Sequence, residues 1–71
     1  MTTYIYIMNT PKGAIPSEVA YLTFEDAYYS ALEALRWTLI EDEGYDIYHI
    51  KSLEALNKID ADYSASVKVN R

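Results

Sequence analysis

The chain has 71 residues, of which 51% are hydrophobic, with 11 carboxylates against six lysines and arginines. This length predicts a single domain, residues 1–71, near the lower limit for a chain that folds on its own core. The net charge of −5 disfavours direct nucleic-acid binding and favours a partner with a basic surface. Because there is no cysteine and no apolar segment of membrane-spanning length, we expect no disulfide, no membrane insertion and a cytoplasmic location.

The first third of the chain predicts two antiparallel strands joined by a turn. Residues 4–8 are aromatic or β-branched, which favours a strand. Residues 9–13 contain Pro and Gly in a pattern typical of a turn, and residues 17–22 are predicted to form the second strand. If the isoleucines of the first strand face the core, Tyr4 and Tyr6 lie on the opposite, open face of the sheet. Tyr4 and Tyr6 are therefore a possible second binding surface.

Residues 24–41 predict the main helix of the fold. Thr23 is a suitable N-cap, and Gly44 can take the left-handed conformation that ends a helix. At helical periodicity, one face gathers the residues expected to contact the core, namely Phe24, Tyr28, Ala31, Leu32, Leu35, Thr38 and Leu39.

Three further elements complete the predicted fold. Residues 45–51 suggest a third strand, Ser52 can cap a short helix over residues 53–58, and residues 63–69 alternate as a fourth strand at a sheet edge. This order predicts a two-layer α+β fold, in which one main helix packs on a mostly antiparallel sheet of about four strands.

The opposite face of the main helix carries large side chains among its charges. Tyr29, Glu33, Trp37 and Ile40 lie at helical spacing on the side that should face water. Trp and Tyr beside carboxylates are typical of protein interfaces, so these four residues are predicted to bind a partner. A second interpretation stays open, in which Trp37 packs against the short helix and Ile40 under the following loop.

Glu41, Asp42 and Glu43 follow this face at the end of the main helix. Three acids there oppose the helix dipole, at a cost of a few tenths of a kcal/mol each, and the sequence shows no structural benefit in return. They are therefore added to the predicted partner-binding residues.

The side chains that carry most enzyme chemistry are scarce. His49 is the one histidine, there is no cysteine, and the two glycines cannot form a phosphate-binding loop. The acids at 41–43 are oxygen ligands of the kind that Mg²⁺ or Ca²⁺ takes, but their spacing is not that of a calcium loop. We expect no enzymatic activity, no metal and no cofactor.

Two segments give the chain a resemblance to a class of proteins. One is residues 22–32, a capped, alanine-spaced helix start that directly follows a strand, and the other is the acidic run 41–43. The chain resembles the very small, acidic, cysteine-free proteins with which bacteriophages block host enzymes, including anti-CRISPR proteins and phage inhibitors of host RNA polymerase. The resemblance implies a stoichiometric inhibitor that occupies a basic or nucleic-acid-binding surface, in the host cytoplasm if the chain is phage-encoded. It transfers no functional residue.

Three functions stay open at this stage. The first is a protein-binding module, an inhibitor that docks on a basic surface of a larger protein. The second is a homodimer that uses the exposed helix face, which would also support a thin core. The third is a small metal-dependent enzyme centred on residues 41–43.

Overall fold

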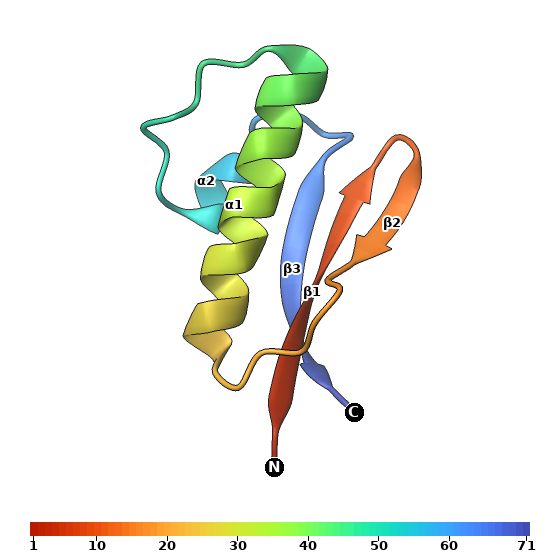
Figure 1. Cartoon of the computed structure of the whole chain (residues 1–71). Helices are drawn as coiled ribbons and strands as arrows, with labels where there is room; N and C mark the ends of the chain where they lie inside the picture. The colour runs from red at the N-terminus through yellow and green to blue at the C-terminus, as the bar shows by residue number, and fades with distance from the viewer.

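Figure 1 shows the computed structural model of the chain, which describes every residue from Met1 to Arg71. In chain order the elements are β1 (Thr3–Thr10), β2 (Gly13–Pro16), α1 (Phe24–Glu43), α2 (Leu53–Leu56) and β3 (Ser64–Asn70). α1 packs across β1 and β3, and α2 lies against α1 (Figure 1). The predicted α+β fold, with one main helix on an antiparallel sheet, is confirmed. None of the helices combines the length and the apolar character that crossing a membrane requires.

The sheet has three strands in the order β2-β1-β3, where the sequence predicted about four. Both pairings are antiparallel, so β1 is the central strand and β2 and β3 are the two edges. Two of the predicted strands differ from the observed ones, for separate reasons.

The second strand begins and ends earlier than predicted. Residues 11–12 form a two-residue turn, so Thr10 already pairs with Gly13. Gly13 has a φ of +124°, a conformation that residues with a side chain rarely adopt. β2 ends at Pro16, because the next residue, Ser17, donates its N–H to the Tyr6 carbonyl at 2.8 Å but accepts the Tyr6 N–H with its hydroxyl and not with its carbonyl. The predicted strand at 17–22 therefore contacts β1 only near its two ends.

The predicted strand at 45–51 is absent. After Gly44 the chain runs back along α1 toward α2 without regular structure (Figure 1), and we call residues 44–52 the return segment. Ile47 is buried and Ile50 packs against the core. The segment lies in the helix layer beside α1, so it has no strand to pair with, and its apolar residues anchor a loop.

α1 begins at the predicted residue and runs slightly beyond the predicted end. The Thr23 hydroxyl accepts a hydrogen bond from the N–H of Asp26 at 3.1 Å. Gly44 takes a φ of +72° and donates its N–H to the Ile40 carbonyl at 3.0 Å. Phe24, predicted to be part of the core contact, is 48% exposed. The buried face of α1 consists of Ala27, Ala31, Leu32, Leu35 and Leu39.

The face of β1 that packs against α1 is the one that was predicted to be open. Met8 is buried in the core and Tyr6 packs against that core. Their cross-strand partners on β3, Ala65 and Val67, lie on the same side. α1 and β3 contribute small alanines to this contact, and the long Tyr and Met side chains can fill the remaining depth between the layers.

The predicted second binding surface is corrected by this orientation. Tyr4 also faces the helix layer, where its ring meets the ring of Phe24 edge-on at 6.0 Å. Strand alternation then places Ile5 and Ile7 on the open face. Tyr4 and Tyr6 belong to the contact between the layers and do not form a separate surface on the far side of the sheet.

Candidate protein-binding face

Three aromatic side chains are exposed along one side of the helix layer. Tyr29 is 65% exposed and Trp37 47%, both on α1, and Tyr48 of the return segment is 58% exposed. Together with Glu33, which lies between the first two on α1, we call these residues the aromatic face. Tyr29, Glu33 and Trp37 were predicted as partner-binding residues, and Tyr48 was not.

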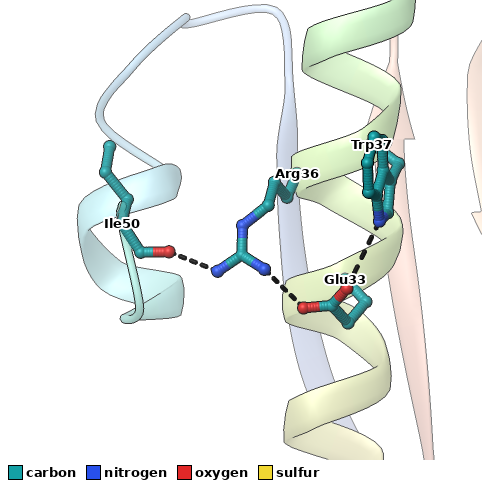
Figure 2. A network of polar contacts seen from close by, with 4 residues as sticks. All are labelled: Glu33, Arg36, Trp37 and Ile50. Carbon is teal, nitrogen blue, oxygen red and sulfur yellow. Dashed lines mark hydrogen bonds and ion pairs between the residues drawn. The ribbon is translucent and has the colours of Figure 1, made fainter. Parts of the chain in front are cut away.

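Glu33 fixes this face through both of its carboxylate oxygens (Figure 2). Oε1 accepts a hydrogen bond from Nη1 of Arg36, and Oε2 accepts one from the indole Nε1 of Trp37 at 3.3 Å. Arg36 also donates from Nη2 to the carbonyl oxygen of Ile50 in the return segment. One carboxylate thereby orients a tryptophan and an arginine, and the arginine fastens the return segment to α1.

The indole of Trp37 has a second neighbour on the return segment. The rings of Trp37 and Tyr48 lie 5.9 Å apart at 79°, the edge-to-face geometry that aromatic pairs favour. Trp37 therefore contacts the return segment and remains about half exposed, which settles its position in favour of the surface. Because its orientation is already restrained, binding a partner would cost it little side-chain entropy.

Arg36 is the buried member of the network. Its side chain is only 12% exposed, and its Nε–H is buried with no hydrogen-bond partner. A buried donor without a partner costs free energy, so the bonds to Glu33 and Ile50 must offset both this cost and the desolvation of the charge. Arg36 therefore holds the aromatic face together from below its surface.

Two shallow hollows adjoin Tyr29, with volumes of about 230 and 250 Å³. Tyr29 and Lys51 line both of them, so a partner's side chains can pack beside the Tyr29 ring in either hollow. The remaining lining residues are Phe24, Glu25 and Tyr28 in the first hollow and Leu32, Glu33 and Arg36 in the second.

Ile40, also predicted for this face, is partly buried and packs against the core. The second interpretation of the sequence, in which Ile40 packs inward, describes its position. It lies closer to the core side of α1 than its spacing from Trp37 suggested, because the return segment continues the core around this flank of the helix.

The acidic run has a structural contact that the sequence could not show. The buried Tyr63 donates its hydroxyl to Asp42 Oδ2 at 3.4 Å and to Glu43 Oε2 at 3.3 Å. Burial of the phenol, together with these two carboxylates, raises the pKa of Tyr63 to about 12. All three acids are exposed, but Asp42 and Glu43 also orient a core tyrosine, whereas Glu41 forms no side-chain hydrogen bond.

Further carboxylates extend this acidic end of the molecule. The Tyr45 hydroxyl donates to Asp60 Oδ2 at 2.9 Å, and this bond raises the pKa of Tyr45. Asp60, Asp62 and Glu43 all act on that phenol electrostatically, so segments far apart in the sequence gather their negative charges here. No group of three or more His, Cys, Asp or Glu side chains is arranged to hold a metal ion.

Comparisons with protein-family models, with curated proteins and with solved structures found no match to this chain. The candidate face therefore rests on its own geometry. Tyr48 is the residue that sequence reasoning missed. Tyr48 lies in a segment that was predicted to be a strand, and nothing in the local sequence indicates that its ring contacts Trp37, 11 positions earlier.

Proposed function

We propose that the protein is a non-enzymatic binding module, an inhibitor that docks its aromatic face and adjoining acids on a basic surface of a larger protein. This is the mode of action implied by its resemblance to the small inhibitors that bacteriophages direct against host enzymes. The observation that carries the proposal is Trp37, an indole held by Glu33 and Tyr48 and still 47% exposed.

Tyr and Trp are enriched among the residues that supply most of the free energy of protein association. Tyr29, Trp37 and Tyr48 place three such rings on one side of a domain this small, next to hollows that can receive a partner's side chains. Exposed apolar area of this kind favours a protein partner.

Charge supports a basic partner in particular. Glu41 lies one helical turn beyond Trp37, on the same side of α1, and leads to the acidic end of the molecule. Complementary charge speeds the encounter of two proteins and orients it, whereas the aromatic anchors slow dissociation. The net charge of −5 adds long-range attraction toward a basic surface.

The test is affinity capture from a lysate of the native host with the immobilised protein and two variants. In Tyr29→Ala/Trp37→Ala the anchors are removed, and in Val19→Ser a similarly exposed apolar residue, 56% exposed, is changed outside the face. We expect one basic protein to be retained by the wild type and by Val19→Ser and to be lost with the double variant. The captured protein is then purified and its binding measured directly.

A third variant tests the electrostatic part. Glu41→Gln/Asp46→Asn/Asp62→Asn neutralises three exposed carboxylates that form no side-chain hydrogen bond in the structure. We expect slower association with the purified partner, and wild-type association that slows as salt is added. Equal capture by the double variant and the wild type would contradict the proposal. If a second copy of the chain covers the aromatic face instead, sedimentation should show a dimer for the wild type and a monomer for Tyr29→Ala/Trp37→Ala.

A further inference from the structure

β3 forms an edge of the sheet whose outer side is only partly covered. In an antiparallel pair, alternate residues direct their N–H and C=O groups toward the partner strand and away from it. Tyr4 and Tyr6 of β1 exchange these groups with residues 17–21 on the other side, so they make no bonds to β3. Their register partners on β3, Val69 and Val67, consequently direct both backbone groups outward.

Asn57 covers the first outward pair of this edge. Its side-chain Oδ1 accepts the Ala65 N–H at 2.8 Å, and its Nδ2 donates to the Ala65 carbonyl at 3.0 Å. A carboxamide has the same donor and acceptor as a peptide group, so Asn57 occupies the place of a neighbouring strand for one residue. The N–H and C=O groups of Val67 and Val69, farther along the edge, have no such partner.

We propose that the Val67–Val69 edge of β3 binds an extended segment of another protein by strand addition, with the sequence pattern apolar-acidic-apolar. The two apolar residues of that segment exchange four backbone hydrogen bonds with Val67 and Val69 and pack beside them on the helix side. The acidic residue lies opposite Lys68 on the open face of the sheet. This binding mode provides affinity through the backbone and specificity through alternate side chains.

Charge selects this occupant over a second copy of the chain. Lys68 and Arg71 take part in no ion pair, since the one ion pair in the molecule joins Arg36 to Glu33. Lys68 lies four residues, about 13 Å, along β3 from Ser64, where the strand leaves the acidic end of the molecule. This separation exceeds the screening distance of about 8 Å at physiological ionic strength. In the two-fold register that satisfies Val67 and Val69, by contrast, a second copy would oppose Lys68 with its own lysine, which is unfavourable.

The test uses a cyclic β-hairpin peptide whose outer strand is Thr-Val-Glu-Val-Thr, with the backbone groups of its two valines facing outward. Cyclisation reduces the entropy that the peptide loses on binding. Two-dimensional NMR of the protein should show the amide signals of Val67 and Val69 shifting and saturating with peptide. A matched peptide with Lys in place of Glu should bind roughly two- to tenfold more weakly.

Two protein variants make the result specific to this edge. Lys68→Glu should reverse the preference between the two peptides. Val69→Pro removes an outward N–H without touching the ladder to β1, so it should abolish binding while the signals of α1 remain in place. Three results would overturn the inference: no shift at Val67 and Val69 at saturating peptide, equal affinity for the two peptides, or β3 shifts that depend on protein concentration without peptide. The last would identify a second copy as the occupant. None of these results depends on the aromatic face.

Discussion

Arg36 and Tyr63 each connect parts of the chain that are distant in sequence. Arg36, which Glu33 orients, joins α1 to the return segment, and Tyr63, the residue before β3, contacts the end of α1. At this scale the sequence indicated which residue types lie on which side of α1, but not which partners they meet. The acids at 42–43 are an example. Their unfavourable interaction with the helix dipole can be read from the local sequence, but their contact with Tyr63, about 20 residues away, cannot.

Arg36→Ala should lower the free energy of unfolding by about 1–3 kcal/mol, because the carbonyl of Ile50 and the Glu33 carboxylate both lose a charged donor. Urea unfolding followed by the fluorescence of Trp37, the single tryptophan, measures the change. Lys51→Ala, an exposed lysine in the same region, is the control and should change stability by less than about 0.5 kcal/mol. If both variants lose the same amount, the Arg36 bonds do not fasten the return segment.

Ionisation of the Tyr63 phenol should lower the stability of the fold at alkaline pH. Its pKa of about 12 in the folded chain lies above the ordinary value of 10.0. A phenol with a raised folded-state pKa stabilises the fold fully below pH 10, and this contribution is lost as the pH rises from about 10 to about 12. Unfolding free energies measured across that range should therefore decline.

Tyr63→Phe should flatten part of that decline, since the residue no longer loses a proton. NMR titration of the tyrosine ring carbons provides a second measurement. One resonance should titrate near pH 12 in the wild type and be missing from Tyr63→Phe. Tyr48→Phe, on the exposed face, serves as the control. A Tyr63 resonance that titrates at the ordinary value would show that the phenol is not buried beside Asp42 and Glu43 in solution.

At the scale of elements, caps and turns decided the boundaries. Thr23 and Gly44 mark the ends of α1 in the sequence and in the structure alike, because capping is a local interaction. The strands were harder to place. Residues 45–51 include side chains that favour strands, but no neighbouring strand lies beside them to pair with. The two-residue turn at 11–12 places the second strand nearer the N-terminus than predicted.

Gly44→Ala should lower the free energy of unfolding by roughly 1–2 kcal/mol, because a residue with a Cβ is strained at a φ of +72°. No atom lies within 4 Å of the added Cβ, so the loss comes from backbone conformation and not from a clash. For a domain of this size, each 1 kcal/mol corresponds to a fall of about 4–8 °C in Tm. Gly44→Asn should lose less, since Asn tolerates this conformation. An unchanged Tm in the alanine variant would show that Gly44 does not end the helix in this way.

At the scale of the whole molecule, the core is thin. Only 11 of 71 residues are buried, and the largest fully buried side chains are Leu35, Leu39 and Leu56. A domain this small rarely gains more than about 3–5 kcal/mol from a single core. The return segment therefore matters for stability, because its buried Ile47 and its partly buried Ile50 complete the core beside α1.

Leu35→Ala should cost about 2–5 kcal/mol, comparable with the entire stability of such a domain, so a large fraction of the variant should be unfolded at room temperature. Far-UV circular dichroism and urea unfolding measure that fraction. Tyr29→Ala, at a residue 65% exposed, is the matched control on the same helix and should stay folded. Cooperative unfolding of Leu35→Ala at wild-type urea concentrations would contradict a core centred on Leu35.

The amino-acid sequence by itself determined the α+β class, the two caps of α1 and the exposure of Tyr29. These features follow from interactions within a few residues or from periodicity along one helix. Only the tertiary structure decided that β1 directs Tyr4 and Tyr6 toward the helix, that residues 44–52 return along α1, and that Tyr48 completes the aromatic face. The physical reason is that each of these depends on the space and the partners supplied by segments far away in the chain, which no local pattern encodes.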